Sequence, residues 1–228
     1  MCGRTSLFAP PELVCERFDA EPIRPLEPRY NVSPGQRHPV VRNDATDEIR
    51  FPTWGLVPER NRDSGGRNAN RGHINARAET LAEKPSFREA FAERRCLVLA
   101  DGFYDWTETP TGKQPYRVER VDREPFAFAG LWEPSGGTDA EPATFAIVTT
   151  EPNAVVEPIH HRMPAMLRRG EESRWLREGD SDLLGPYPAE ELRAYPVPDA
   201  VGNPKNDSPA VVEEVPAEEE VQTGLDEF

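Results

Sequence analysis

The chain has 228 residues, which is enough for one domain with a buried core but too few for two domains and a linker. Its formal net charge is −14, and its three cysteines, Cys2, Cys15 and Cys96, have no CxxC spacing, so the composition favours neither disulfide bonds nor a zinc site. The N-terminus lacks a basic region followed by an apolar stretch, and no run approaches about 18 apolar residues, so neither secretion nor a membrane span is indicated. We therefore expect a single cytoplasmic domain that uses no metal and no organic cofactor.

The charge pattern is unusual because arginine supplies almost all of the positive charge. Of the 27 basic residues only three are lysine, namely Lys84, Lys113 and Lys205. Such an excess of carboxylates is typical of halophilic proteins, and the net negative charge argues against a nucleic-acid partner. At the high ionic strength that such a surface suits, the Debye length falls to about 3 Å, so arginines close to a ligand count for more than the total charge.

The first half of the chain predicts short helices and strands. Residues 10–20 predict a helix, and residues 39–41 and 48–51 predict strands. The segment 59–72 is rich in glycine, asparagine and arginine, and is either a mobile insertion or a phosphate contact. Ser86 and Glu89 have the spacing of a capping box, which predicts a helix over 87–94.

The second half is dominated by predicted strands, at 96–100, 103–106, 116–121, 125–132 and 144–150. Helices are expected at 153–156, 171–177 and 189–195, with 162–167 extended. Strands at such short spacing favour antiparallel pairing, so we predict an α+β fold with a curved, mainly antiparallel, barrel-like sheet and short flanking helices. From Glu213 onward there are seven acidic residues and no basic one, so we assign residues 2–215 to the domain and residues 216–228 to a disordered tail.

Cys2 follows the initiator methionine directly. Methionine aminopeptidases usually remove Met1 when the next side chain is small, and the mature chain would then begin with a free 1,2-aminothiol. Its thiol, with a pKa of about 8.5, and its α-amine, with a pKa of about 7.7–8.0, both ionise near neutral pH. An amine condenses with an aldehyde to a Schiff base, and a neighbouring thiol can close that base to a five-membered thiazolidine. Cys2 is therefore a candidate aldehyde trap.

Four segments place polar residues in apolar or tightly turned surroundings: Cys2–Arg4, Ile74–Thr80, Asp101–Trp106 and Ile159–Pro164. Further motifs follow in a matching order: Tyr30–Pro34, Trp54–Leu56, Glu83–Phe87, Phe126–Trp132 and Val201–Asn206. Together these segments resemble the SOS response-associated peptidase (SRAP) family, whose members shield abasic sites in DNA. The resemblance covers most of the chain.

The resemblance implies that Cys2, once Met1 is removed, crosslinks to the ring-opened aldehyde of an abasic deoxyribose in single-stranded DNA. Opening the sugar and losing water from the carbinolamine require proton transfer. His160 is suited to this role because the reference pKa of histidine is about 6.5. Asp105 would hold or deprotonate the α-ammonium, and Asn75 would position the sugar hydroxyl or Cys2. Without the resemblance, His160 would be interpreted as a buried core histidine. Asp105 would be interpreted as a residue that caps a turn or pairs with an arginine, and Asn75 as a turn residue.

Five further residues match DNA-contacting positions. Arg4, Arg77 and Arg162 each lie one or two residues from a proposed catalytic group, where a guanidinium could bind the phosphates of the lesion. Pro34 and Trp106 match positions that wedge the strand or stack on bases, and stacking is worth about 1–3 kcal/mol per base.

The chain departs from the family pattern in two places. Asp105 stands where the family usually has glutamate, so its reach is one methylene shorter. After Trp54–Pro58 many members have a second tryptophan, whereas this chain continues with Glu59, Arg60 and the basic loop.

Two other functions stay open at this point. A thiol peptidase, which would cleave either its own chain or another one, would use Cys2 with His160 as the base. A non-catalytic reader of modified or damaged DNA would not need Cys2 at all. The expected partner is single-stranded DNA with abasic sites, bound by a monomer that associates with the nucleoid and meets replication or repair factors.

Overall fold

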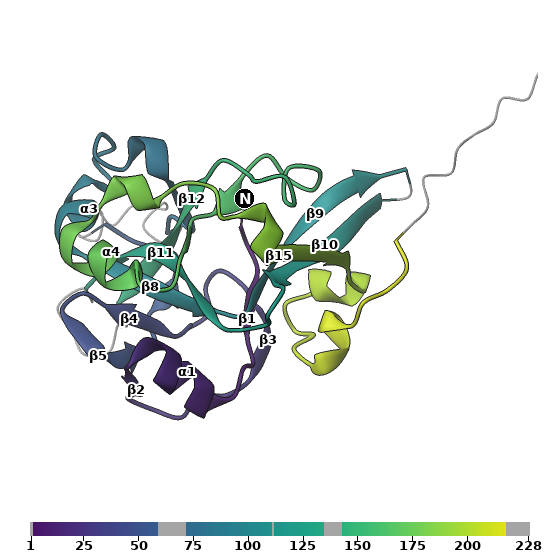
Figure 1. The fold of residues 1–228 in the computed structure, drawn as a ribbon, viewed down its shortest axis with the longest axis horizontal. Coiled ribbons are helices and arrows are strands. Elements are labelled where there is room, and N and C mark those ends of the chain that lie inside the picture. Colours follow the sequence, from purple (N-terminus) through teal and green to yellow (C-terminus); the bar gives the residue numbers. More distant parts are fainter. Residues whose placement is uncertain (1, 59–71, 111, 135–142, 218–228) are drawn as a thin grey trace, which may run out of the picture.

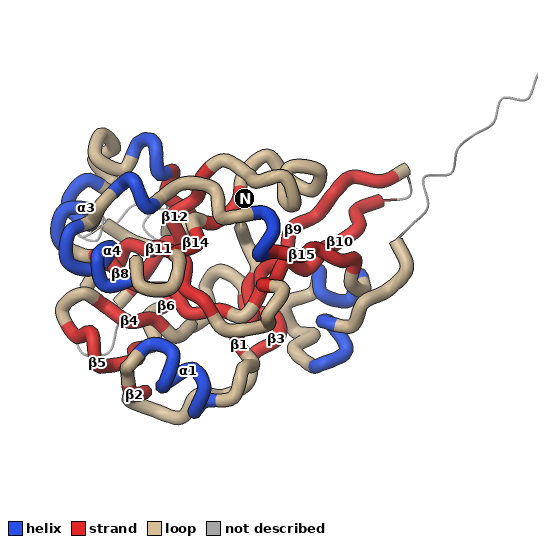
Figure 2. The backbone as a smooth tube through the Cα atoms, viewed as in Figure 1, coloured by secondary structure: helices blue, strands red, loops and turns tan. Residues whose placement is uncertain are grey.

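The architecture was determined from a computed structural model, which describes residues 2–58, 72–110, 112–134 and 143–217. Two β-sheets make up most of the molecule, and short helices lie at its periphery (Figures 1 and 2). The α+β class and the mainly antiparallel pairing are confirmed, but the strands form two large sheets that do not close into a barrel.

The first sheet contains five antiparallel strands in the order β15-β10-β9-β1-β3. Their bounds are Thr5–Leu7 (β1), Arg29–Val32 (β3), Gly102–Thr109 (β9), Gly112–Arg120 (β10) and Leu192–Pro196 (β15). The outer ends of β9 and β10 project from the body of the molecule as a long hairpin (Figure 1).

The second sheet has the main order β13-β12-β11-β8-β4-β5-β2, to which β6, β7 and β14 add short pairings. The longer strands are Val40–Arg42 (β4), Ala45–Arg50 (β5), Arg95–Ala100 (β8), Phe126–Glu133 (β11) and Thr144–Thr150 (β12). The short strands are Glu21–Pro22 (β2), Thr53–Trp54 (β6), Asn75–Arg77 (β7), Met163–Pro164 (β13) and Met166–Leu167 (β14). Both β6 and β7 run parallel to β12, and β2 runs parallel to β5.

Among the described residues, three α-helices lie outside the sheets: α1 (Pro11–Phe18), α3 (Arg88–Glu93) and α4 (Glu172–Glu178). Helix α1 has proline in its first turn, where the missing N–H costs nothing, and α4 ends at Gly179 in the left-handed conformation. The predicted capping box is wrong, because α3 begins after Phe87 and its N-cap makes no side-chain hydrogen bond. Five 3₁₀ helices complete the described chain: η1 (Ala78–Thr80), η2 (Ser181–Leu183), η3 (Ala189–Glu191), η4 (Asp199–Gly202) and η5 (Pro209–Val212).

Two predicted helices are wrong. Residues 153–156 form a turn, because the Asn153 side chain accepts the amides of Val155 and Val156 at 3.1 and 3.0 Å and so competes with helical bonding. Of residues 189–195, only Ala189–Glu191 are helical, and the rest enter β15, which pairs with β10 over five residues. Tertiary pairing there overrides the local preference.

The side chains between the two sheets form one of the hydrophobic cores. It includes Val32 and Phe103 from the first sheet and Val98, Phe128 and Ile147 from the second. Side chains alternate between the two faces of a strand, so Asp105, two residues after Phe103 in β9, lies on the same face as Phe103. Tyr104 and Trp106 lie on the opposite face, against a smaller core near the C-terminal segment.

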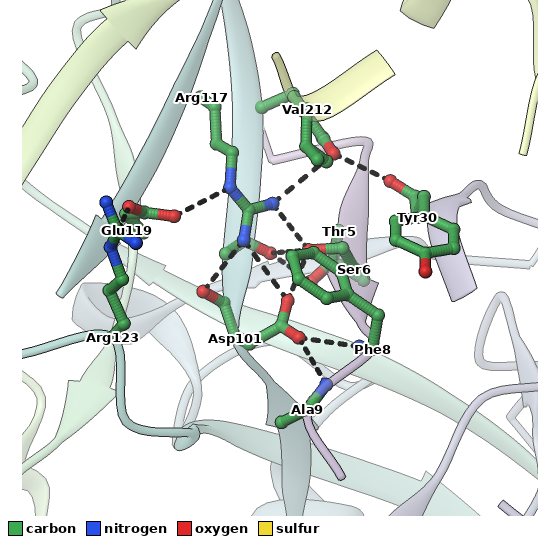
Figure 3. Close-up of polar contacts among 12 residues, drawn as sticks. Thr5, Ser6, Phe8, Ala9, Tyr30, Asp101, Arg117, Glu119, Arg123 and Val212 are labelled. Carbon is green, nitrogen blue, oxygen red and sulfur yellow. Dashed lines mark hydrogen bonds and ion pairs between the residues drawn. The ribbon is translucent and has the colours of Figure 1, made fainter. Parts of the chain in front are cut away.

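Strand β1 and the residues directly after it are fixed by a buried polar network (Figure 3). Arg117 donates to Ser6 Oγ at 2.7 Å, to the Asp101 carbonyl at 3.1 Å and to Glu119 Oε2 at 2.9 Å. Asp101 in turn accepts the Ser6 hydroxyl at 2.6 Å. The network therefore anchors β1, the strand that follows Cys2.

Within the described ranges no helix is long and apolar enough to cross a membrane. The same residues contain no group of three or more His, Cys, Asp or Glu side chains that could hold a metal ion. Of the predicted basic loop, residues 59–71 lie outside the described residues, as do residues 218–228 of the predicted tail.

Candidate functional site

Cys2 lies in the core between the two sheets and is fully buried. Its thiol faces the Arg4 carbonyl, with 3.8 Å between Sγ and the oxygen. Burial, and second the negative charge of Asp105, raise the pKa of this thiol to about 12. The thiol is therefore protonated at neutral pH, and its side chain lies within electrostatic range of Asp105.

Strand β9 brings Asp105 beside the N-terminal segment. Thr5 pairs with Phe103, and the Tyr104 amide donates to the Arg4 carbonyl at 3.0 Å, so residues before Arg4 run toward Asp105. Asp105 is 5% exposed, and its Oδ1 accepts the Trp106 amide at 3.0 Å. Burial is the main cause that raises the Asp105 pKa from 3.8 to about 6. Asp105 is thus a carboxyl group that can exchange a proton near neutral pH.

His160 approaches Asp105 from the loop before β13. Its Nδ1 lies 3.8 Å from Asp105 Oδ2, 3.0 Å from the Arg162 amide and 3.1 Å from the Arg162 carbonyl. Burial lowers the His160 pKa, and the ring stacks on His161 with 4.2 Å between centroids. An imidazole that is neutral at pH 7 therefore faces a carboxyl group with a raised pKa, which is the pairing that general acid–base chemistry needs.

Asn75 opens β7, where it pairs with Ile147 of β12. Both polar atoms of its amide, Nδ2 and Oδ1, are buried, and neither has a hydrogen-bond partner within the described part of the chain. Buried polar groups are nearly always bonded, and an exception needs an explanation. An amide held in this state on a regular strand is suited to bind a polar ligand.

A cleft of about 800 Å³ opens at Asp105 and His160, whereas Cys2 and Asn75 are not among its lining residues. From the predicted set it is lined by Arg4, Asp105, Trp106 and His160. Its other lining residues are Thr107, Glu108, Lys113, Glu157, Ile159, His161 and Gly202. The cleft thus combines the two proton-transfer candidates with an aromatic ring and a guanidinium.

The three predicted phosphate-binding arginines differ in their surroundings. Arg4 donates to Asn31 Oδ1 at 2.9 Å and to the carbonyls of Val201 and Gly202 at 2.7 and 2.9 Å. Arg77, in β7, is exposed. The side chain of the third arginine, Arg162, is only 12% exposed and pairs with Glu79. Their binding to DNA stays a prediction.

Of the two predicted base contacts, only Trp106 borders the cleft. Its ring is partly buried against the C-terminal core, and the Arg4 guanidinium lies 5.8 Å from the ring centroid. Pro34 lies in a turn closed by Ser33 and Gln36, and within the described chain it is not part of the cleft lining. Its predicted contact with DNA is not tested.

Sequence reasoning missed Glu79 as a member of the site. Arg162 donates to both carboxylate oxygens of Glu79, at 2.6 and 3.0 Å, and to the Thr149 carbonyl at 2.6 Å. The only signal was position, since Glu79 lies within the motif Ile74–Thr80 next to two proposed site residues. A pair separated by 83 positions gives no local pattern.

Asn31 was also missed. Its Nδ2 donates to the carbonyls of Val201, Asn203 and Asn206 at 3.0, 3.1 and 2.9 Å. Asn31 and Arg4 therefore join the motifs Tyr30–Pro34 and Val201–Asn206, and this contact places Gly202 at the cleft.

The chain is similar to known proteins of one family. The family model described as "SOS response associated peptidase (SRAP)" matches residues 1–204. The abasic site processing protein YoqW of Bacillus subtilis (strain 168) is 39% identical over 225 residues, which cover 93% of this chain and 99% of YoqW. The abasic site processing protein HMCES of Rattus norvegicus is 30% identical over 266 residues, covering 92% of this chain and 74% of HMCES.

A crystal structure of a protein from Bacteroides thetaiotaomicron has the same fold, with a TM-score of 0.83 and 30% identity. The match covers 94% of this chain and all of that one. The family match over residues 1–204 and the identity to YoqW decide the classification. This chain belongs to the SRAP family.

Proposed function

We propose that this protein shields abasic sites in single-stranded DNA by forming a covalent thiazolidine between Cys2 and the aldehyde of the ring-opened deoxyribose. The observation that carries the proposal is the meeting of Asp105 and His160, 3.8 Å apart, at a cleft beside the buried Cys2. The names of YoqW and HMCES, which call both proteins abasic site processing proteins, support the same substrate.

The reaction needs the α-amine that removal of Met1 would release. The amine adds to the aldehyde carbon to give a carbinolamine, which takes up a proton, breaks its carbon–oxygen bond and loses water to form an iminium. The Cys2 sulfur then adds to the iminium carbon, and the thiol proton is released, which returns the proton that was taken up. One water leaves overall, and one carbon–nitrogen and one carbon–sulfur bond are formed.

The residues of the site have distinct roles in this scheme. The imidazolium form of His160, which is the minor form at pH 7, delivers a proton to the sugar ring oxygen as the ring opens. Asp105 takes a proton from the α-ammonium and assists the loss of water. Asn75 offers its free amide donor and acceptor to the sugar or to Cys2. The Cys2 thiol is protonated and therefore a weak nucleophile, so the amine attacks first. The positive iminium that forms beside the sulfur would then lower the thiol pKa.

The DNA strand would lie along the cleft and contact Trp106 by stacking. Exposed Arg77 is the arginine best placed to meet a phosphate without breaking an existing contact. Shielding in this sense retains the protein on the lesion by a covalent bond, so the net charge of −14 does not prevent retention.

The test is incubation with a uracil-excised oligonucleotide, followed by denaturing electrophoresis. Mass spectrometry of the mature N-terminus establishes first that Met1 is absent. Wild-type protein should give a denaturant-stable adduct without added reductant. The Cys2→Ala protein keeps an α-amine but has no thiol, so its adduct should survive only after borohydride reduction. Cys15→Ala, the same change at a partly buried cysteine, should behave as wild type.

A peptide substrate in parallel separates this function from a thiol peptidase. A peptidase requires a thiolate, and the Cys2 thiol is held in the protonated form. Cleavage of the peptide that is lost in Cys2→Ala, together with absence of the DNA adduct in the wild type, would overturn the proposal. An adduct that persists unreduced in Cys2→Ala would overturn the role of the thiol.

A further inference from the structure

The peptide groups of Arg162 contact one nitrogen of His160 with both a donor and an acceptor. The Arg162 amide lies 3.0 Å from Nδ1, and the Arg162 carbonyl lies 3.1 Å from the same atom. A neutral ring with its proton on Nε2 accepts the amide at Nδ1, whereas an imidazolium donates from Nδ1 to the carbonyl. Nδ1 therefore has a partner from Arg162 in either state, and the proton that the ring gains or loses is the one on Nδ1, which also lies 3.8 Å from Asp105 Oδ2.

The side chain of Arg162 is held by a fork-shaped contact. Its two terminal nitrogens donate to the two oxygens of Glu79 at 2.6 and 3.0 Å, and one also donates to the Thr149 carbonyl at 2.6 Å. The Arg162 side chain is only 12% exposed. Charge-assisted contacts with two parallel bonds fix orientation as well as distance.

Glu79 comes from a different part of the chain than His160. It lies in η1, directly after β7, and the Arg162 pair thus joins the segment that carries Asn75 to the loop that carries His160. Strand β12 lies between them, since it pairs with β7 on one side and β13 on the other.

We propose that Glu79 is a positioning residue for His160, which acts through Arg162: its carboxylate fixes the Arg162 guanidinium and thereby the backbone groups that occupy Nδ1. The neutral ring is then held in the tautomer with its proton on Nε2, and it gains or loses a proton at Nδ1. This inference rests on the proposed function, because the step that it serves is the proton transfer assigned to His160.

The competing role for Glu79 is a gate on DNA binding. If Arg162 binds a phosphate, it must first leave Glu79, and loss of the carboxylate would free it for DNA. The two roles predict opposite results when Glu79 is neutralised. Under the positioning role the reaction slows at unchanged affinity, whereas under the gate role affinity rises.

The experiment compares Glu79→Gln with Glu83→Gln, the same change at an exposed carboxylate four residues on. Crosslinking rates to an abasic oligonucleotide are measured across pH, with affinity for the intact oligonucleotide and thermal unfolding as further readouts. Nuclear magnetic resonance of the imidazole carbons and nitrogens reports the His160 tautomer and its titration. The other charged or titratable groups around His160 are Asp105, His161, Glu157 and Arg162, and all of them are kept.

For Glu79→Gln we expect a crosslinking rate about 10-fold lower, as is usual when a second layer of contacts is lost. The pH profile should shift, and the neutral ring should show a mixture of tautomers, whereas Glu83→Gln should match wild type. Affinity for intact DNA should stay unchanged. An unchanged rate and tautomer in folded Glu79→Gln protein, or tighter DNA binding with an unchanged rate, would overturn the inference.

The tautomer readout separates this inference from the proposed function. If the wild-type protein forms no adduct, the proposed function fails, but the resonances of His160 still show whether Glu79 fixes its ring. A single tautomer in both proteins would reject the positioning role even where the adduct forms normally.

Discussion

The two faces of β9 carry buried polar groups that are handled in opposite ways. On one face, Arg117 lies opposite Tyr104 in the β9–β10 register, and it contacts Ser6, Asp101, Glu119 and the Tyr104 hydroxyl. On the other face, Asp105 is a buried carboxyl with a pKa raised to about 6. On β7, the Asn75 amide has no hydrogen-bond partner within the described chain.

The polar groups on one face stabilise the fold, whereas those of the site are available to bind a ligand. Burial of a charge costs several kcal/mol unless partners replace water, and the Arg117 network supplies such partners. At Asn75 that cost is left uncompensated within the described chain, which is usual for sites that gain their partners from a substrate. Substitutions on the two faces should therefore change different quantities.

The largest expected effect is that of Arg117→Met. It leaves Asp101 and Glu119 as buried carboxylates without their main cation, so the free energy of unfolding should fall by about 3–5 kcal/mol. Urea denaturation measures this value. The control is Lys113→Met on the same strand, where Lys113 is 64% exposed and pairs with an exposed Glu108, so the change should stay below about 1 kcal/mol. A similar small loss for both variants would mean that the network does not hold the fold.

Asp105→Asn should have the opposite profile. The rate of adduct formation should fall at least about 100-fold, because a group that exchanges a proton is replaced by one that cannot. The free energy of unfolding at pH 7.5 should be equal to wild type or higher, since the buried charge is removed. Single-turnover gel assays and urea denaturation give the two values.

Asp105→Glu restores the residue usual in the family and should keep the wild-type rate or exceed it. A faster Asp105→Asn protein would contradict the catalytic role. A protein destabilised as strongly as Arg117→Met would contradict the division between the two faces.

The sequence predicted the larger strands because their patterns are long enough to recognise. The apolar run that became β8 and the alternation in β9 both gave strands at the expected places. Strands β1, β3 and β7 were not predicted, since three or four residues cannot establish a period of two. Their existence depends on pairing with distant strands, and β1 and β7 are the strands that place Cys2 and Asn75.

The site was predicted by motif and completed by tertiary contacts. Cys2 was found from its position, and Asp105 and His160 from motifs that resemble a family, and the structure brings Asp105 and His160 to one cleft. The spacing of residues could not show that Arg162 is held by Glu79. It also could not show that Asn31 bonds to Val201 and so joins two motifs about 170 residues apart. Such contacts depend on the fold rather than on neighbouring residues.

An effect of intermediate size is expected when the same substitution is made at two buried asparagines, Asn75 and Asn31. Asn75→Leu removes two buried polar atoms that lack partners, so the free energy of unfolding should rise by about 1 kcal/mol while adduct formation slows about 10-fold. Asn31→Leu removes an amide bonded to three carbonyls and to Arg4, so it should lower the free energy of unfolding by about 2 kcal/mol or more. Urea denaturation and the adduct assay are run on both. Equal destabilisation of the two variants would show that the Asn75 amide is bonded in solution and is not reserved for a ligand.

The smallest expected effect is a change in how stability depends on pH, because two buried groups titrate in opposite senses. Burial lowers the pKa of His38 from 6.5 to about 4, so its contribution is complete above pH 6.5 and is lost as the pH falls toward 4. Asp105 has its pKa raised from 3.8 to about 6, so its contribution is present below about pH 4 and is lost as the pH rises through 6. Between pH 4 and 6 the two slopes oppose each other. Asp105→Asn removes one of them, so its free energy of unfolding should rise more steeply with pH than that of wild type.

Urea denaturation at several pH values measures the slopes, with Asp182→Asn, an exposed aspartate, as the control that keeps the wild-type slope. A slope in Asp105→Asn equal to that of the control would show that Asp105 is ionised across this range, and its role as a carboxyl that exchanges protons near neutral pH would then have to be abandoned.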